Sequence, residues 1–337
     1  MAGCLRVLSG TDNLQDLVDA AFQVRKTHFD RFVTVHILNN VQNGACPEDC
    51  RYCAQSVSSS APIEAYPMKS DAEIIEEARA ARDSGAWRYC MVFAGTGPSD
   101  ERIDHLCRLV REIKSRYTIE VCVSPGVVTQ AQARKLKEAG LDRLNHNLNT
   151  SARYYDKICT THTYQQRLMT LAAAKAEGLK VCSGVIVGMG ESKDDVVEMA
   201  LKLRHFKADS IPVNFFMPIA GVAIKEEVGL TPDYCLRVLC LFRFLNPASE
   251  IRMAAGREMH LRELEPLGLY VANSLFLQGY LNVRGSSNAR TLQMIRDEGF
   301  KIRSEVPLDT LLEKENLHHP GDDGGLKGLN ELRPFKV

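Results

Sequence analysis

Cys46, Cys50 and Cys53 carry the clearest chemical signature in this chain of 337 residues. Thiolate sulfur is the usual ligand of iron–sulfur clusters, and the spacing Cys-x3-Cys-x2-Cys places three thiols on one short loop. Three thiols bind three irons of a cubane cluster, so the fourth iron stays open for a small ligand. Structural zinc is the alternative, but it takes four protein ligands, and no fourth follows at zinc-finger spacing.

Strand-like and helix-like segments alternate along the chain, a pattern that is typical of parallel α/β architecture. A helix is expected over residues 70–84, with Ser70 or Asp71 as its N-cap. Eight strands are expected, the number that closes a (β/α)8 TIM-type barrel, and an open doubly wound sheet is the alternative. The expected strands are residues 33–41, 88–94, 118–124, 141–147, 179–187, 210–216, 250–255 and 274–278.

The chain is expected to form one domain with a short tail. Residues 1–317 are interpreted as a single barrel domain with an N-terminal helical extension. Residues 318–337 are rich in glycine and charge, so we expect a flexible C-terminal tail. The adjacent His318 and His319 open this tail and are interpreted as surface residues.

Side-chain alternation along the expected strands predicts a polar lumen. Successive strand residues point to opposite faces, and one face of each barrel strand fills the lumen. Cys122, Cys182 and Arg252 each lie on the face opposite their apolar neighbours, and Asn147 and Asn149 share one face. A lumen with a purely structural role is filled mainly by Val, Ile and Leu. Thiol, amide and guanidinium groups therefore indicate a ligand site.

Composition excludes several classes of protein. Formal net charge is +0, so nothing indicates a nucleic-acid partner or an anionic membrane surface. No apolar run approaches the roughly 20 residues of a membrane span, and the N-terminus has no secretory signal pattern, so we expect a cytoplasmic location. The 11 cysteines in such a chain favour metal binding or buried packing over disulfides.

The spacing of Cys46, Cys50 and Cys53 resembles that of the radical S-adenosylmethionine superfamily. This resemblance implies a [4Fe–4S] cluster whose open iron binds the amino and carboxylate groups of S-adenosylmethionine. An electron from the cluster then cleaves the sulfonium and gives a 5′-deoxyadenosyl radical. Tyr52 matches the aromatic residue that the superfamily places near the adenine.

A longer resemblance, to the biotin synthase family, covers roughly residues 30–285. It implies radical insertion of sulfur into dethiobiotin by a homodimer, with a flavodoxin-type or ferredoxin-type electron donor. The cluster loop NGACPEDCRYCAQS at 43–56 carries the likeness. Further blocks follow in the family's order: RYCMVFAG (88–95), LNHNLNTS (144–151), TYQQRLMTLAAAKAEGLKVCSGVIVGMGES (163–192), IPVNFF (211–216), IRMAAGRE (251–258) and ANSLFLQGYL (272–281).

The family resemblance also implies a second cluster inside the barrel. This is a [2Fe–2S] cluster that donates the sulfur and is held by three cysteines and an arginine. The matching positions are Cys90, Cys122, Cys182 and Arg252, each on a separate expected strand. The alternatives are buried packing for each cysteine and an ion pair for the arginine.

Contacts to cofactor and substrate are implied in the same way. Asn147 matches a contact near the ribose and substrate, Asn214 a contact to the ureido ring of dethiobiotin, and Ile186 an apolar contact to adenine. The family's aspartate for the ribose hydroxyls is Asn149 here, which has one acceptor oxygen instead of two. The family's Gly-Thr-Pro-Leu reads GVAI at 221–224. These departures fit either a divergent member or a paralogue with another substrate.

Three functions remain open from the sequence. The first is a sulfur-inserting enzyme of the biotin synthase type. The second is another radical S-adenosylmethionine enzyme on the same barrel, such as a maturase or a lyase. The third is a non-catalytic iron–sulfur or zinc protein. Five further cysteines match no ligand position: Cys4, Cys107, Cys159, Cys235 and Cys240. Of these, Cys107, Cys235 and Cys240 are interpreted as packing residues of helices.

Overall fold

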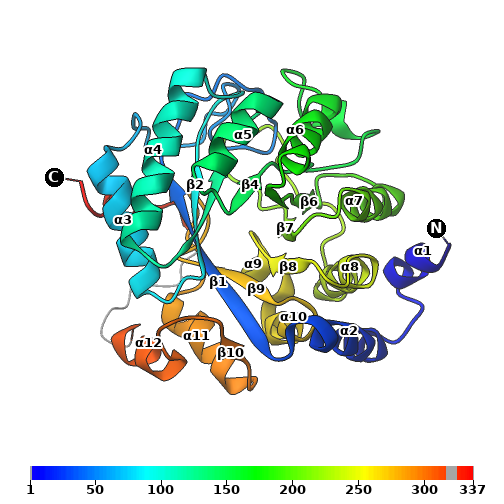
Figure 1. Cartoon of the computed structure of the whole chain (residues 1–337). Coiled ribbons are helices and arrows are strands. Elements are labelled where there is room, and N and C mark those ends of the chain that lie inside the picture. The colour runs from blue at the N-terminus through cyan, green and yellow to red at the C-terminus, as the bar shows by residue number, and fades with distance from the viewer. Residues whose placement is uncertain (1, 316–324, 337) are drawn as a thin grey trace.

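The computed structural model describes residues 2–315 and 325–336. Parallel strands form one sheet that closes on itself, because β1 (Phe32–Asn40) pairs with both β2 (Arg88–Val92) and β9 (Ser274–Leu277). Helices surround the strands (Figure 1). The fold is therefore the expected (β/α)8 TIM-type barrel, and the open sheet is excluded.

The remaining barrel strands each overlap an expected one. The strand expected over 179–187 is divided at Ser183 and Gly184 into two segments, both of which pair with the next strand. A short further strand pairs with the start of β1. The bounds are β3 Glu120–Ser124, β4 Arg143–Asn145, β5 Lys180–Cys182, β6 Val185–Val187, β7 Ser210–Phe215, β8 Glu250–Met253 and β10 Lys301–Ile302.

The first outer helix begins where capping chemistry predicts. Ser70 is the N-cap of α3 (Asp71–Asp83), and its hydroxyl accepts a hydrogen bond from the Glu73 backbone N–H. The Glu73 carboxylate accepts one in return from the Ser70 N–H, at 2.9 Å, which completes a capping box. The other helices of the outer layer are α4 Asp100–Arg116, α5 Gln130–Glu138, α6 Tyr164–Ala176, α7 Lys193–His205, α8 Pro232–Leu245, α10 Glu265–Val271 and α11 Asn288–Asp297.

Shorter elements complete the described chain. At the N-terminus, α1 (Ala2–Ser9) and α2 (Leu14–Phe29) pack against α8. None of the helices in residues 2–315 and 325–336 combines the length and apolar character that crossing a membrane requires. The remaining helical segments are η1 Tyr155–Lys157, α9 Arg257–Leu261, η2 Arg262–Leu264, α12 Leu308–Glu315 and α13 Leu329–Leu332.

The main apolar core lies between the strands and the outer helices. Val121 on β3 and Val181 on β5 are fully buried there, together with Ile74 of α3. Their neighbours Cys122 and Cys182 belong to a separate buried group inside the barrel. The barrel strands thus separate an outer apolar layer, which stabilises the barrel, from a lumen lined by reactive groups.

The expected tail, residues 318–337, lies partly outside the described residues, and so do His318 and His319. Its described part, residues 325–336, contacts the barrel. Leu326 forms a β-bridge with Val283, and Arg333 pairs with Glu73 at 2.7 Å. The flexibility of the tail stays a prediction, but residues 325–336 differ from a free segment because they have specific partners.

Candidate active site

The loop after β1 carries Cys46, Cys50 and Cys53, which we call the loop triplet. The loop begins where β1 ends, at the end of the barrel where TIM-barrel active sites form. The Cys53 N–H donates to the Cys50 carbonyl at 3.0 Å, so a tight turn brings these two residues close together. Cys46 and Cys53 are half-buried and Cys50 is buried. Three thiols on one compact loop fit the thiolate ligation that an iron–sulfur cluster needs.

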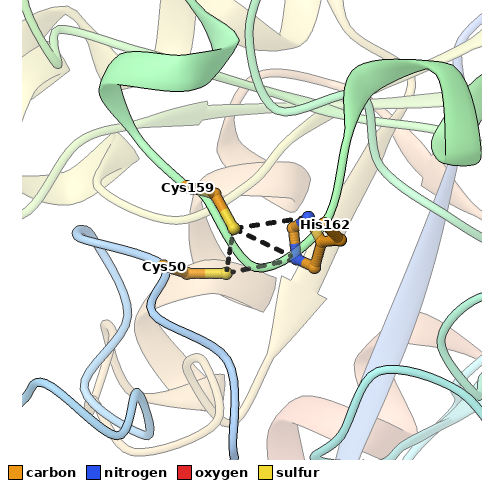
Figure 2. A group of neighbouring side chains, drawn as sticks. All are labelled: Cys50, Cys159 and His162. Carbon is orange, nitrogen blue, oxygen red and sulfur yellow. Dashed lines mark hydrogen bonds between the residues drawn. The ribbon is translucent and has the colours of Figure 1, made fainter.

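Cys50 also contacts two residues from a distant part of the chain (Figure 2). Its Sγ lies 3.7 Å from Cys159 Sγ and 3.5 Å from His162 Nε2. The Cys50 thiol donates to Cys159, which raises the pKa of Cys50 and lowers that of Cys159 to about 4. Arg167 donates to His162 Nε2 at 3.2 Å and to the Asn147 carbonyl at 2.9 Å.

Cys90, Cys122 and Cys182 converge inside the barrel, and we call them the strand triplet. Cys90 and Cys122 lie opposite each other in the register of β2 and β3. Cys182, on β5, accepts a hydrogen bond from the Asn145 amide at 3.3 Å. All three are buried in one group. Pairing of neighbouring strands in the barrel wall therefore brings together three thiols that are far apart in the sequence.

The three thiols of the strand triplet are close enough to shift each other's pKa values. Hydrogen bonding with Cys122 lowers the pKa of Cys182 to about 5 and lowers that of Cys90 as well. The pKa of Cys122 is raised by the same hydrogen bonds. Burial opposes the two thiolates, but the positive charge of Arg252 favours them. The thiolate form is the one that binds metal, so this triplet suits a metal centre.

A lumen cavity of about 280 Å³ connects the two triplets. Of the loop triplet, Cys53 lines this cavity, whereas Cys46 and Cys50 are not among the described residues that line it. The rest of the expected site, except Asn149, contributes to the same cavity. These lining residues are Tyr52, Cys90, Cys122, Asn147, Cys182, Ile186, Asn214 and Arg252.

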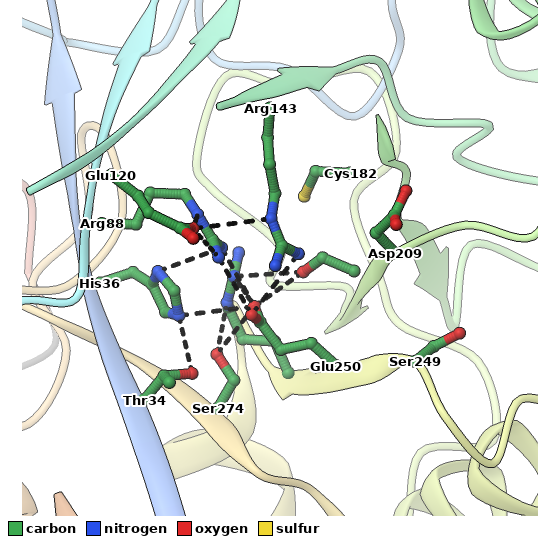
Figure 3. A network of polar contacts seen from close by, with 12 residues as sticks. Thr34, His36, Arg88, Glu120, Arg143, Cys182, Asp209, Ser249, Glu250 and Ser274 are labelled. Atoms are coloured by element: carbon green, nitrogen blue, oxygen red, sulfur yellow. Dashed lines mark hydrogen bonds and ion pairs between the residues drawn. The ribbon is translucent and has the colours of Figure 1, made fainter. Parts of the chain in front are cut away.

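A network of charged side chains lies beneath the strand triplet, since Arg88 precedes Cys90 by two positions on the same face of β2. Figure 3 shows this network together with Cys182. Arg88 Nη2 pairs with Glu120 at 2.6 Å and with Glu250 at 3.1 Å. Glu250 also pairs with Arg252, and Arg143 Nη1 lies 3.5 Å away from it. We call these five residues the base network. Glu250 is 6% exposed, so the guanidinium groups around it supply the compensation that a buried carboxylate requires.

The base network carries excess positive charge towards the lumen. Three guanidinium groups face two carboxylates, and His36 beside them adds no charge, because burial and then Arg252 lower its pKa. Arg252 donates from Nε to Ser274 at 2.8 Å and from Nη2 to Ser210 at 3.2 Å. No described residue accepts a hydrogen bond from its Nη1. The network thus orients Arg252 and complements the thiolates above it.

The expected cofactor contacts lie around the upper part of the lumen cavity. The Asn147 amide oxygen accepts from the Gly184 N–H at 2.8 Å. The Asn214 amide donates to the Val185 carbonyl at 2.9 Å and accepts from the Ala255 N–H at 3.1 Å. Backbone groups therefore fix the orientation of both amides before any ligand binds.

The two departures from the family pattern lie close to Tyr52. Asn149 has a positive φ of 67° and donates from Nδ2 to the Tyr52 hydroxyl at 2.6 Å. Val222 is buried against Phe216 and Met189 in a small apolar group that Tyr52 borders. Both substitutions thus act on the surroundings of Tyr52, and neither residue lines the cavity.

Comparisons with known proteins agree with this geometry. The radical SAM superfamily model matches residues 41–203, and the model of the biotin and thiamin synthesis associated domain matches residues 212–301. Biotin synthase of Magnetococcus marinus is 56% identical over 86% of this chain and 90% of that protein. Biotin synthase of Acaryochloris marina is 52% identical over 91% of this chain and 89% of that protein.

The chain belongs to the biotin synthase family. It is therefore an enzyme of the radical S-adenosylmethionine type, and the non-catalytic alternative is excluded. Among solved structures, methylornithine synthase superposes with a TM-score of 0.74 over 92% of this chain and 95% of that one, at 19% identity. The hydrogenase maturase HydG of Carboxydothermus hydrogenoformans superposes with a TM-score of 0.76 over 88% of this chain and 74% of that one, at 18% identity. At these identities the likeness concerns the fold alone.

The sequence did not predict several residues that contact the site. Cys159 and His162 reach Cys50 across more than 100 positions, and no spacing rule links them. Glu250 and Arg88 did have a signal. Each lies two residues before an expected lumen residue, Arg252 or Cys90, and therefore on the same strand face.

Proposed function

We propose that this chain converts dethiobiotin to biotin by radical insertion of sulfur, with two iron–sulfur clusters and S-adenosylmethionine as cofactors. One observation carries the proposal: the lumen cavity of about 280 Å³ is lined both by Cys53 and by the strand triplet. A substrate held in this cavity lies between two metal-binding groups. Family membership supplies the reaction and the substrate.

The loop triplet would hold a [4Fe–4S] cluster, because Cys46, Cys50 and Cys53 supply three thiols and leave one iron open. S-adenosylmethionine would then lie in the upper cavity. Tyr52 and Ile186 supply apolar contacts there. Asn147 supplies a preset amide, and Asn149 acts through its hydrogen bond to the Tyr52 hydroxyl.

The strand triplet and Arg252 would hold a [2Fe–2S] cluster. Hydrogen bonding with Cys122 lowers the pKa values of Cys90 and Cys182, which favours the thiolate form that binds metal. The Nη1 of Arg252 has no acceptor among the described residues, and the base network fixes the rest of its guanidinium. A guanidinium is normally protonated and is a weaker ligand than a thiolate, which suits a cluster that gives up a sulfur atom.

When bound, the two clusters supply the electron that cleaves S-adenosylmethionine and the sulfur that enters the product. The chain supplies position and shelter. Asn214 would bind the ureido ring of dethiobiotin through the N–H that its backbone contacts leave free. Leu38, Phe216 and Phe276 line the cavity with apolar surface, which excludes water from the reacting groups.

Three further parts of the proposal rest on family membership. The enzyme would act as a homodimer, take electrons from a flavodoxin-type or ferredoxin-type donor, and work in the cytoplasm. Size-exclusion chromatography with light scattering tests the first part. Reduction assays with each purified donor test the second.

The direct test is anaerobic incubation of the reconstituted protein with dethiobiotin, S-adenosylmethionine and a reductant. We expect mass spectrometry to detect biotin, together with 5′-deoxyadenosine and methionine. Formation of 5′-deoxyadenosine without biotin, from protein that holds both clusters, would contradict dethiobiotin as the substrate. The departures at Asn149 and Val222 would then mark a different pocket.

A further inference from the structure

Cys50, Cys159 and His162 form a buried group beside the loop triplet (Figure 2). Each offers one ligand atom, and these atoms all lie within 4.8 Å of one another. The two sulfurs are 3.7 Å apart, and His162 Nε2 lies 3.5 Å from Cys50 Sγ and 3.4 Å from Cys159 Sγ. Two soft sulfur donors and an imidazole are typical ligands of a thiophilic divalent cation.

These separations match tetrahedral zinc. Zinc binds sulfur at about 2.3 Å and nitrogen at about 2.0–2.1 Å. Tetrahedral angles then place two sulfurs about 3.8 Å apart, and a sulfur and a nitrogen about 3.5 Å apart. The three separations in the structure therefore permit one ion to contact all three atoms with little movement.

The surroundings of His162 support this assignment. Its Nδ1 is hydrogen-bonded to the Tyr155 hydroxyl at 2.8 Å, which leaves Nε2 as the ligand atom. A partner on the second ring nitrogen is the usual arrangement for metal-binding histidines. Arg167 donates to Nε2 at 3.2 Å, and a bound ion would replace this hydrogen bond, while Arg167 keeps its hydrogen bond to the Asn147 carbonyl.

A fourth ligand is close. Asp49 Oδ1 lies 3.2 Å from Cys159 Sγ, and the Thr160 N–H holds this oxygen at 2.9 Å. A carboxylate oxygen binds zinc at about 2.0–2.2 Å, so a small shift of Asp49, or a water molecule, completes the tetrahedron.

We propose that the cluster-free enzyme binds one Zn²⁺ ion through Cys50, Cys159 and His162. Both cysteines bind as thiolates, and their protons pass to solvent. Because Cys50 also belongs to the loop triplet, this ion and the first cluster exclude one another. The zinc site stands on the geometry alone, while its competition with the cluster rests on the proposed function.

The first experiment uses Co²⁺ as a spectroscopic probe of the metal-free, reduced, full-length protein. We expect the parent chain to bind one Co²⁺ more than Cys159→Ser, with the intense visible bands of tetrahedral thiolate coordination in the difference spectrum, and displacement by Zn²⁺. Cys159→Ser and His162→Gln each remove a ligand, so the affinity should fall at least about tenfold, the lower end of what the loss of an outer partner costs. Circular dichroism establishes that each variant is folded.

Two controls separate this site from others. Cys46→Ala removes a loop thiol but no proposed zinc ligand, so its cobalt spectrum should equal that of the parent chain. Cys107→Ala, at a buried cysteine of α4, should also leave the spectrum unchanged. A spectrum lost in Cys46→Ala and kept in Cys159→Ser would show that the loop triplet binds the ion instead. Weak octahedral bands in the parent chain would overturn the site as well.

A second experiment tests the competition. Protein preloaded with one Zn²⁺ should fail to build the first cluster from iron and sulfide until a chelator removes the zinc. Cys159→Ser should build it at the same rate with or without zinc. Equal assembly rates for zinc-loaded and metal-free parent protein would refute the exclusion. Absence of biotin from fully reconstituted protein would instead count only against the proposed function.

Discussion

The loop triplet and the strand triplet hold the same number of thiols by different means. Cys46, Cys50 and Cys53 lie within eight consecutive positions, and turns of one loop bring them together. The strand triplet comes from β2, β3 and β5, and the pairing of neighbouring strands from β2 to β5 assembles it. A local spacing rule therefore identifies the first triplet, whereas the second becomes visible only with the fold.

The two triplets also differ in their surroundings. Cys46 and Cys53 are half-buried, whereas Cys122 and Cys182 are 1% and 2% exposed. Beneath the strand triplet the base network supplies positive charge, and Arg252 favours the thiolate form of Cys182. The loop suits a cluster that must meet S-adenosylmethionine and an electron donor. The rigid strands suit a cluster held against the substrate.

The largest expected effect comes from breaking the loop triplet. Cys46→Ala leaves two loop thiols, so the first cluster should be lost and with it the cleavage of S-adenosylmethionine. Chromatography should detect no 5′-deoxyadenosine, while Cys107→Ala should match the parent chain. Unchanged 5′-deoxyadenosine from Cys46→Ala would show that the loop triplet is not the site of cleavage.

The second largest effect is expected in the base network, which should contribute more to the free energy of unfolding than a surface ion pair does. Glu250→Gln leaves Arg88 and Arg252 without their shared carboxylate. We expect the free energy of unfolding to fall by about 3 kcal/mol, the lower end for breaking a buried ion pair. The matched control Glu112→Gln removes an exposed pair with Arg116 and should cost no more than about 0.5 kcal/mol.

Urea unfolding of the metal-free proteins provides the measurement. Equal losses in Glu250→Gln and Glu112→Gln would mean that the base network contributes nothing beyond a surface ion pair. The barrel would then hold the strand triplet in place by apolar packing alone.

Alkylation rates should separate the two triplets in the metal-free protein. Cys182 has its pKa lowered to about 5, which favours reaction, but it is 2% exposed, which prevents access. We expect burial to decide, so that Cys46 reacts with iodoacetamide more than about tenfold faster. To produce that ratio, opening the lumen to the reagent must cost about 1.4 kcal/mol more than the lowered pKa of Cys182 contributes to its reactivity. Peptide mass spectrometry over time gives both rates, and faster labelling of Cys182 would contradict the expected rigidity of the lumen.

The smallest effect is expected at Asn149. Asn149→Asp exchanges the donor to the Tyr52 hydroxyl for an acceptor, and the tyrosine can donate in return. One such hydrogen bond contributes about 0.5–1.5 kcal/mol, so the affinity for S-adenosylmethionine should change by about tenfold or less. Calorimetric titration of reconstituted protein measures this change. Complete loss of turnover would indicate that the pocket near Tyr52 has been rebuilt for a different ligand.

Much of the fold could be predicted because local rules determine it. Strand alternation correctly separated Cys122 and Cys182 from their apolar neighbours, and capping chemistry limited the start of α3 to Ser70 or Asp71. The interruption at Ser183 and Gly184 was not predicted, although a glycine inside a strand pattern often marks a bend or bulge.

The contacts of the site were harder to predict than its members. Arg88 and Glu250 lie on lumen faces that the alternation rule identifies, but their pairing depends on which strands become neighbours after closure. Cys159 and His162 come from the loop after η1, and loops follow no periodicity that would orient a side chain. Their contact with Cys50 required the structure.

The central claim is that the two triplets hold clusters with different tasks, and Cys182→Ala tests it most directly. Reconstituted variant and parent chain are incubated with dethiobiotin, S-adenosylmethionine and a reductant, and both products are quantified together. We expect the variant to form 5′-deoxyadenosine, because the loop triplet is intact, but no biotin, because the sulfur donor is missing. Biotin at the parent yield from Cys182→Ala, or loss of both products from a folded variant, would contradict the division of tasks between the triplets.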